Sequence, residues 1–386
     1  MLVAVTTNSR FAPPRAAYIH VPFCRHRCGY CNFTLIAGRD DLVDSYLQAI
    51  TRELSWLETP REVDTLFIGG GTPTHLTCEQ LQQLCATITE WFPLADGHEA
   101  SVEANPLDLT IEKVDLLASY GLNRISLGAQ SFSASKLALL ERDHRREQIV
   151  SAFEAARETM QSVSLDLIFG VPDETLDNWE IDLKLALGLS PDHVSTYGLM
   201  FERGTSFWSR LMKEDLTQVA EEVERQMYLA AIHRLTQADF EQYEVSNFAR
   251  PGHRCRHNEV YWAGETYFAA GPGAARYIDG RRETNHRSTT TYLNRVLANQ
   301  SPVAESETLD AEDSARERLV FGLRRLEGVD RGGFATATGF EIDQLVGKPL
   351  SKFAHAKLLE DDGSRIRMTQ EGLLVSDSIW PEFLRR

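Results

Sequence analysis

The amino-acid sequence lacks a long apolar run, a basic tract and the start of a secretory signal. Its 386 residues include 56 aspartates and glutamates but only 40 lysines and arginines, which gives a formal net charge of −16. Nucleic-acid-binding surfaces normally show clustered Lys and Arg, and a membrane span needs about 18 consecutive apolar residues. Residues 1–15 have neither a positively charged leader nor a long apolar core. We therefore expect a cytoplasmic protein that binds no nucleic acid and has no transmembrane segment.

Cysteine is also scarce, with six in the chain, yet Cys24, Cys28 and Cys31 fall within eight residues directly after a short apolar run. Three thiolates at this spacing can hold three irons of a cubane iron–sulfur cluster, and the fourth iron then needs a ligand from outside the protein. A zinc site completed by His20 or His26 is the alternative, but zinc sites usually show two paired groups of ligands. A disulfide would leave one thiol unpaired and would need an oxidising compartment.

The segment from Tyr18 to about Met200 alternates short β-rich runs with amphipathic helical patterns, which is typical of βα units around a parallel sheet. The sequence predicts six strands: Ala17–Val21, Thr65–Gly69, Glu99–Ala104, Arg124–Gly128, Ser164–Phe169 and His193–Tyr197. Six units are too few for a closed eight-stranded barrel. An amphipathic helix over Asp215–Ala238 could follow the sixth strand, so we predict an α/β fold with a partial (β/α)6 barrel in residues 1–250.

The predicted strands end in residues that are unusual for strands, and the carboxyl ends of barrel strands are where active sites form. The first strand leads into the cysteine loop and the second into Gly69–Thr74, where missing side chains would let backbone N–H groups approach a ligand. Glu103 lies at the end of the third strand, Gln130 follows the fourth, and Asp166 interrupts the apolar fifth. Each of these side chains alone could be structural, because a buried acid needs a partner and that partner can be another group of the protein. Together on one rim they indicate a binding site.

The C-x-x-x-C-x-x-C spacing, with Tyr30 just before the last cysteine, resembles the radical S-adenosylmethionine superfamily. The further motifs are similar to those of its oxygen-independent coproporphyrinogen III oxidase group; they are Tyr18–Cys24, Gly69–Thr74, Glu103–Pro106, Gln130–Phe132, Arg142–His144 and Asp166–Pro172. The resemblance covers nearly the whole chain and implies that Cys24, Cys28 and Cys31 bind a [4Fe-4S] cluster whose open iron chelates S-adenosylmethionine. It also implies ten contacts to that cofactor, from Tyr18, Tyr30, Gly70, Gly71, Thr72, Glu103, Gln130, Arg142, Asp166 and Met200.

Two features depart from the oxidase itself. The oxidase pattern has a further cysteine two residues after the third, where this chain has Phe33, and it has a longer segment ahead of Tyr18, which only 17 residues precede here. In contrast, His257–Trp262 matches the His-Asn-x-x-Tyr-Trp pattern of the HemW branch, the haem chaperones that resemble the oxidase. Ala275 stands where that branch usually has a histidine. We assign this motif to a connecting segment, residues 251–304.

The residues around this motif could hold haem. The stretch His253–His257 supplies two imidazoles and a thiol as possible axial ligands and two guanidinium groups that could pair with propionates. Tyr261 and Trp262 could pack on the flat macrocycle. We take His257 as the candidate haem ligand. The alternative, that His257 and Asn258 only hydrogen-bond a turn, fits the sequence equally well, because isolated histidines are commonly structural.

From about Glu305 onward the sequence predicts short helices and one strand. The helices are Ala311–Leu326, Gly332–Thr338, Glu341–Val346, Leu350–Glu360 and Gln370–Ser376, and the strand is Arg365–Met368. They indicate a small, mostly helical, winged-helix-like domain in residues 305–386, after a polar linker near Asn299–Asp310. Such domains often bind DNA, but the acidic chain argues against it. We expect the domain to cover the open side of the barrel or to receive a partner.

The first functional hypothesis is therefore a haem chaperone that binds haem, a [4Fe-4S] cluster and S-adenosylmethionine, and that delivers haem to acceptor haemoproteins, with respiratory enzymes as candidates. An electron donor would serve the cluster, and any radical chemistry would come from the cofactor while the protein excludes water. The rivals are an oxygen-independent coproporphyrinogen III oxidase, which decarboxylates propionates in porphyrin biosynthesis, and a zinc-stabilised binding module. The sequence leaves open whether the protein is an enzyme, which residue ligates haem, and how many cofactor molecules bind.

Overall fold

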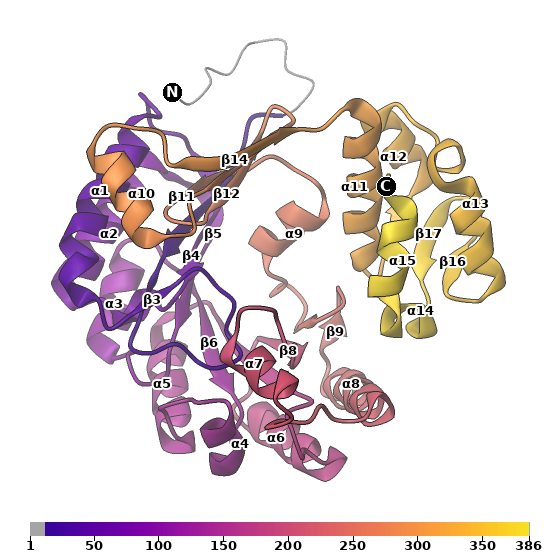
Figure 1. Ribbon diagram of the computed structural model, residues 1–386, viewed down its shortest axis with the longest axis horizontal. Coiled ribbons are helices and arrows are strands. Elements are labelled where there is room, and N and C mark those ends of the chain that lie inside the picture. Colours follow the sequence, from indigo (N-terminus) through magenta and orange to yellow (C-terminus); the bar gives the residue numbers. More distant parts are fainter. Residues whose placement is uncertain (1–11, 386) are drawn as a thin grey trace.

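The computed structural model describes residues 12–385. Figure 1 shows an open barrel of strands and helices, drawn in indigo to red, and a small, mostly helical unit in yellow that stands beside it. Each part has its own apolar core: one runs from Ala17 to Val296 and the other from Ala315 to Phe383. Within the described residues, no helix combines the length and the apolar character that crossing a membrane requires.

Six parallel strands pair in the order in which they follow one another along the chain, which confirms the predicted partial barrel. Every predicted strand lies inside an observed one; these are β1 (Ala16–Val21), β4 (Val63–Gly70), β5 (Leu94–Ala104), β6 (Arg124–Gln130), β7 (Ser162–Phe169) and β8 (His193–Gly198). Each crossover between consecutive strands carries at least one helix, and consecutive strands joined in this way usually lie side by side. All six carboxyl ends therefore meet at one rim.

Three short strands extend this sheet at its two edges, and the sequence did not predict them. β11 (Phe268–Ala270) runs parallel to β1, whereas β10 (Asn247–Ala249) pairs antiparallel with β8 and with β9 (Glu241–Gln242). Runs of two or three residues are too short to show a two-residue period. In the part of the chain that the structure describes, β11 and β9 do not pair with each other, so the barrel stays open.

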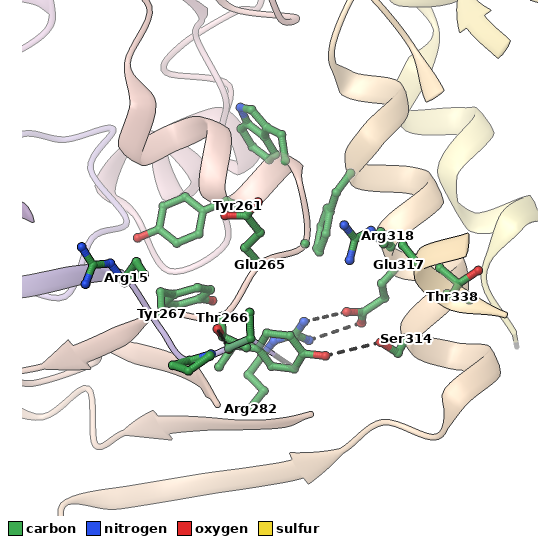
Figure 2. A pocket seen from close by; sticks show the side chains of 18 of the residues that line it. Arg15, Tyr261, Glu265, Thr266, Tyr267, Arg282, Ser314, Glu317, Arg318 and Thr338 are labelled. Carbon is green, nitrogen blue, oxygen red and sulfur yellow. Dashed lines mark hydrogen bonds and ion pairs between the residues drawn. The ribbon is translucent and has the colours of Figure 1, made fainter. Parts of the chain in front are cut away.

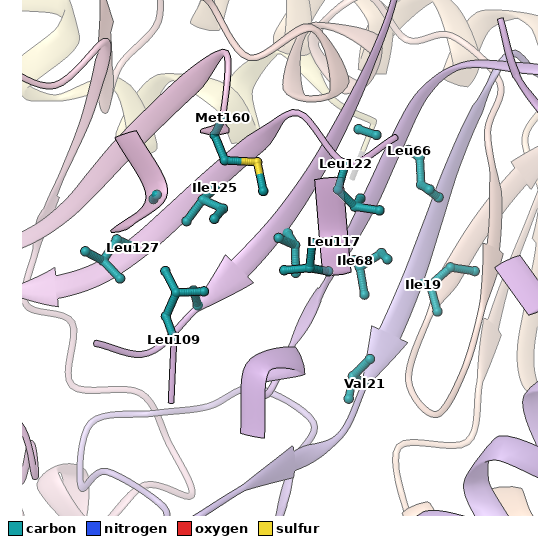
Figure 3. Close-up of a cluster of buried hydrophobic side chains, with 14 of the residues drawn as sticks. Ile19, Val21, Leu66, Ile68, Leu109, Leu117, Leu122, Ile125, Leu127 and Met160 are labelled. Atoms are coloured by element: carbon teal, nitrogen blue, oxygen red, sulfur yellow. The ribbon is translucent and has the colours of Figure 1, made fainter. Parts of the chain in front are cut away.

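The strands alternate between apolar side chains that face the helices and polar or aromatic ones that face the barrel interior. Figure 3 shows the outward set, such as Ile19, Ile68 and Ile125, which meets the surrounding helices in the core. Burial of each such side chain stabilises the fold by about 1.5–3 kcal/mol. The covering helices are α1 (Val43–Ser55), α2 (Cys78–Trp91), α3 (Ile111–Ser119), α4 (Ala134–Leu139), α5 (Arg146–Thr159), α6 (Leu176–Gly188) and α8 (Glu221–Gln237). The last of these confirms the helix predicted after the sixth strand, although it begins six residues later.

The segment that joins the two cores carries more regular structure than the sequence suggested. It contains α9 (Arg256–Trp262), β12 (Ala275–Ile278), β13 (Arg281–Asn285), α10 (Thr289–Leu297) and β14 (Val303–Thr308). The prediction of a polar linker near Asn299–Asp310 is wrong there, because β14 pairs with β13. Five of the six β14 residues are exposed, so this edge strand lacks the apolar alternation by which strands are recognised.

The C-terminal part is mostly helical with a small three-stranded sheet. Its elements are α11 (Ala311–Arg324), β15 (Val329–Asp330), α12 (Arg331–Thr338), α13 (Ile342–His355), β16 (Leu359–Asp361), β17 (Arg365–Met368), α14 (Gln370–Leu374) and α15 (Ser376–Phe383). The predicted helix Leu350–Glu360 is wrong at its end. Lys357 has φ 59°, which stops the helix, and β16 then pairs with β17.

Candidate cofactor site

The three cysteines lie on a loop at the carboxyl end of β1, and the surrounding chain fixes its shape. Two short strands, β2 (Phe23–Cys24) and β3 (Ile36–Ala37), pair in parallel at its base. The backbone N–H of Cys31 donates to the carbonyl oxygen of Cys28 at 3.0 Å. Gly29 is needed for close approach, since a Cβ there would lie 2.5 Å from the ring of Phe207. The loop therefore presents its cysteines from a defined backbone conformation.

A cavity of about 670 Å³ opens beside this loop, within the size range of sites for small ligands. Cys24, Cys28 and Cys31 line it, together with nine of the ten residues assigned to the cofactor by resemblance: Tyr30, Gly70, Gly71, Thr72, Glu103, Gln130, Arg142, Asp166 and Met200. These residues are far apart in the sequence. They meet because they occupy the rim where neighbouring parallel strands end, which is where barrel proteins place their sites.

Burial keeps the thiols of Cys24 and Cys31 protonated until a metal binds. It raises the pKa of Cys24 to about 12 and also raises the pKa of Cys31, and the neighbouring thiols add to both shifts. Thr72 Oγ1 lies 3.3 Å from Cys24 Sγ, and Arg142 Nη1 lies 3.8 Å from Cys28 Sγ. Among residues 12–385, no three such ligands converge on a single ion, whereas a cubane cluster binds each cysteine through a different iron. The donor set thus fits an iron–sulfur cluster, whose binding would release the thiol protons.

Two half-buried carboxyl groups face the same cavity, and neither forms an ion pair with a described residue. Glu103 accepts a hydrogen bond from the N–H of Gly70 at 2.8 Å, and both oxygens of Asp166 lie 3.0 Å from Ser126 Oγ. Burial raises the pKa of Glu103 to about 7, with a contribution from the nearby Asp166, and burial also raises the pKa of Asp166. Carboxyl groups that are shielded from water and form no ion pair favour a cationic ligand. The ammonium and sulfonium groups of S-adenosylmethionine would supply that charge.

The glycine run at the end of β4 serves chain packing. The backbone N–H groups of residues 70–72 donate to the Glu103 carboxylate and to the carbonyl oxygens of Val21 and Phe23. The expectation that these N–H groups point toward a ligand is therefore wrong. A Cβ on Gly71 would lie 2.7 Å from the carbonyl oxygen of Phe23, so the missing side chains let this turn pack directly against the cysteine loop.

Tyr18, the tenth assigned contact, lines a separate cavity of about 670 Å³. Its hydroxyl lies 2.9 Å from His20 Nδ1, and His20 Nε2 lies 2.6 Å from the carbonyl oxygen of Thr34. Burial lowers the pKa of His20 to about 4, so its ring is neutral. Asn32 and Phe33 line both cavities, and Phe33 is 64% exposed. Tyr18 thus belongs to the space next to the main cavity.

Several residues of the main cavity were not assigned to it from the sequence. Ser126, Ile168 and Tyr197 line it from β6, β7 and β8, and Ser246 joins them from the loop before β10. Ser126 could have been found, because it lies two positions before Gly128 and inward positions repeat every second residue. Ser246 could not, since the sequence did not predict the antiparallel pairing of β10.

The candidate haem ligand His257 lies inside the barrel, near the start of β4. Its Nδ1 lies 3.0 Å from Thr65 Oγ1 and its Nε2 lies 2.8 Å from the hydroxyl of Tyr261. The ring stacks on Phe67 with centroids 5.3 Å apart, and the side chain is almost fully buried. Burial lowers the pKa of His257 to about 3. Both ring nitrogens are used within the protein, so ligation of haem iron would require one of these bonds to break.

The other groups proposed for haem near this motif also have protein partners. Cys255 is buried, with its sulfur 3.7 Å from Glu99 Oε1, and Arg256 donates to the carbonyl oxygen of Gly97 at 2.6 Å. Arg254 has three carboxylates within 3.6 Å, those of Glu241, Glu259 and Glu327. These arginines therefore hold the segment in place, which leaves them poorly available for propionates.

A third cavity, of about 630 Å³, lies between the barrel side and α11 (Figure 2). Its walls are rich in aromatic rings, contributed by Tyr261, Trp262, Tyr267, Tyr277 and Phe321. Arg282 reaches in from β13 and forms two ion-pair contacts with Glu317 of α11. Arg318, also on α11, has no hydrogen bond or ion pair within residues 12–385. Aromatic walls beside an unpaired cation suit a flat, anionic ligand.

Comparisons with known proteins agree with this architecture. Residues 18–186 match the model of the Radical SAM superfamily, and residues 309–375 match that of the HemN C-terminal domain. Heme chaperone HemW of Bacillus subtilis is 36% identical over 375 residues, which cover 96% of this chain and 99% of that protein. Heme chaperone HemW of Escherichia coli is 33% identical over 387 residues, covering 96% and 98%.

A solved structure shares the fold. Coproporphyrinogen III oxidase (HemN) from Escherichia coli, described as a radical SAM enzyme, superposes with a TM-score of 0.85 at 24% identity, covering 98% of this chain and 91% of that one. An open barrel with a three-cysteine loop at its rim, followed by a HemN-type C-terminal domain, defines a radical SAM protein. The full-length relatives narrow this class further: the chain belongs to the HemW family. Radical SAM proteins as a class use a [4Fe-4S] cluster and S-adenosylmethionine.

Proposed function

We propose that this chain is a cytoplasmic haem chaperone that binds a [4Fe-4S] cluster, S-adenosylmethionine and haem, and passes haem to acceptor haemoproteins. The observation that carries the proposal is the match, over almost the full length of both chains, to proteins named heme chaperone. The three-cysteine cavity and the aromatic cavity beside α11 support it. Respiratory enzymes are candidate acceptors, and an electron donor would serve the cluster.

In this proposal Cys24, Cys28 and Cys31 hold the cluster, and the cavity beside them holds the cofactor. Glu103 and Asp166 would pair with its positive charges, since burial raises the pKa of both and neither forms an ion pair within the described residues. The remaining assigned contacts would enclose it: Tyr18, Tyr30, Gly70, Gly71, Thr72, Gln130, Arg142 and Met200. When bound, the cluster can supply one electron to the sulfonium group. The protein's own contribution is to bind and orient the cofactor and to exclude water from the cavity.

The proposed haem site is centred on α9, with His257 as the candidate ligand. His257 is buried, so ligation requires the hydrogen bond between its Nε2 and Tyr261 to open. Tyr261 and Trp262 already line the aromatic cavity, where Arg318 offers a charge for a propionate. A haem that enters from this side would meet flat aromatic surfaces first and the histidine second.

The alternative function is oxygen-independent coproporphyrinogen III oxidation, which the shared fold with the oxidase favours. One experiment separates the two. The protein is reconstituted anaerobically with iron and sulfide, then titrated with haem while coproporphyrinogen III turnover is assayed in parallel. A Soret band at low haem concentration without decarboxylation supports the chaperone. Decarboxylation at a catalytic rate would overturn it. Zinc in place of iron in the purified protein would contradict both functions.

A further inference from the structure

Gln130, one of the residues that line the cofactor cavity, has an unusual backbone conformation. It ends β6 with φ 63°, in the left-handed region that non-glycine residues rarely adopt. The pairing of β6 with β7 also shifts register here, because Leu127 pairs with Leu165 whereas Gln130 pairs with Leu167. An advance of three residues along β6 thus lies opposite an advance of two residues along β7. Such a bulge re-aims a side chain, and a strained conformation of this kind persists only where its surroundings enforce it.

A buried carboxylate on a neighbouring helix holds the residues that directly follow Gln130. Asp182 of α6 accepts a hydrogen bond from Ser131 Oγ at 2.6 Å and one from the backbone N–H of Phe132 at 2.8 Å. The two bonds use different oxygens of the carboxylate, so they fix the direction of the chain as well as its position. The side chain of Asp182 is 1% exposed, which removes water as a competitor for these donors.

A lysine ties the same carboxylate to a second loop of the cavity. Lys136 Nζ lies 3.1 Å from Asp182 Oδ2 and also forms a short contact with Glu174. Glu174 accepts from the backbone N–H of Val171 at 3.1 Å, three residues after the cavity residue Ile168. The lysine and both acids are buried. This cluster therefore links the chain after β6 to the chain after β7, although none of its three ionic side chains lines the cavity.

We propose that Asp182 is a positioning residue of the cofactor site: it holds the left-handed bulge that directs Gln130 toward S-adenosylmethionine. The inference rests on the proposed function in that the cavity must bind this cofactor. A purely structural role would stabilise the fold without acting through Gln130. The two roles differ in one measurable respect. If Asp182 acts only through Gln130, then losing its carboxylate no longer weakens cofactor binding when Gln130 has been replaced by alanine.

The test is a double-mutant cycle on the reconstituted full-length protein, with S-adenosylmethionine binding measured by anaerobic equilibrium dialysis without reductant. We expect Asp182→Asn and Gln130→Ala each to raise the dissociation constant about tenfold. In the double variant we expect the same affinity as in Gln130→Ala alone, because the effects of substitutions at coupled residues do not add. The absorbance of the iron–sulfur cluster should be unchanged in all three.

Asp192→Asn is the matched control. Asp192 is also a buried carboxylate that accepts a backbone N–H, from Val163 at 2.9 Å, but it lies at the opposite end of the strands. Its loss should lower the melting temperature and leave cofactor affinity unchanged. If Asp182→Asn fails to fold, Ser131→Ala removes one of the two bonds and should raise the dissociation constant about threefold.

Two results would overturn the inference. One is an Asp182→Asn variant that binds the cofactor as tightly as the wild type. The other is an Asp182→Asn substitution that lowers the affinity for the cofactor by the same factor in the wild type and in the Gln130→Ala variant. A wild-type protein that holds its cluster but does not bind S-adenosylmethionine would instead refute the proposed function. The two failures are thus distinguishable.

Discussion

The cysteine cavity and the α9 segment differ in how their polar groups are paired. In the cavity, Glu103 and Asp166 are half-buried acids that form no ion pair within the described residues, and burial raises the pKa values of two thiols. Around α9, both ring nitrogens of His257 have hydrogen-bond partners, and Arg254 is surrounded by carboxylates. The first region lacks charges that only a ligand can supply. In the second region, the ring of His257 and the guanidinium group of Arg254 already have partners within the protein.

This difference separates a preformed site from one that must open. Acids that are shielded from water and form no ion pair destabilise a protein when they ionise, so their presence indicates selection for binding at the expense of stability. Buried polar groups that have hydrogen-bond partners within the protein indicate a structural role. If haem is ligated by His257, its binding must break a hydrogen bond in α9, whereas the cofactor should enter its cavity without such a cost.

The largest effect is expected from loss of a cluster cysteine. Replacing Cys24, Cys28 or Cys31 by serine removes a soft thiolate ligand, so each variant should lose nearly all iron and the brown cluster absorbance after reconstitution. Iron and sulfide analysis measures this. Cys78→Ser is the control, since Cys78 lies on α2 away from the cavity. Retention of a full cluster by any of the three variants would contradict the assignment.

Glu103→Gln should weaken cofactor binding and stabilise the apoprotein at high pH. The pKa of Glu103 is about 7 in the folded chain and near 4.5 ordinarily, so stability falls as pH rises through this window and the loss is complete above pH 7. At pH 8 the variant should be more stable by about 3 kcal/mol, with the difference vanishing below pH 4.5. Urea unfolding of apoprotein at pH 5 and 8 measures this. Equal stability of both proteins at pH 8 would contradict it.

His257→Ala should remove two hydrogen bonds and a buried ring, which costs about 2–4 kcal/mol of folding free energy. If His257 is the haem ligand, the Soret band seen with wild-type protein should be lost. Tyr261→Phe is the matched variant: it frees Nε2 at a cost of about 1 kcal/mol and should retain the band. An unchanged band in folded His257→Ala would exclude His257 as the ligand.

Arg318→Ala should have the smallest effect. Its guanidinium group is partly exposed at the cavity wall, so loss of a propionate contact should raise the dissociation constant for haem about threefold to tenfold. Fluorescence quenching of the nearby Trp262 by haem can follow the titration. Arg316→Ala is the control, because Arg316 is paired with Glu312 and does not line the cavity. Equal affinities in both variants would place haem elsewhere.

Much of the fold could be predicted from the sequence because the barrel strands are long and apolar. Ser164–Phe169 and Arg124–Gly128 were placed correctly since their outward residues fill the core. Short or exposed strands were missed: β14 has no buried residue, and β10 is three residues long. The helix end at His355 depends on the pairing of β16 with β17, which local sequence does not reveal.

The sequence by itself determined the chemistry available to this protein: three closely spaced thiols, acids at strand ends, and an order of motifs that identifies the family. Only the tertiary structure decided which groups face a ligand and which face one another. The N–H groups of residues 70–72 bond within the protein, Tyr18 lies in the neighbouring cavity, and His257 is buried between Thr65 and Tyr261. The physical reason is that hydrogen-bond partners come from distant strands, and their approach depends on packing that no local pattern encodes.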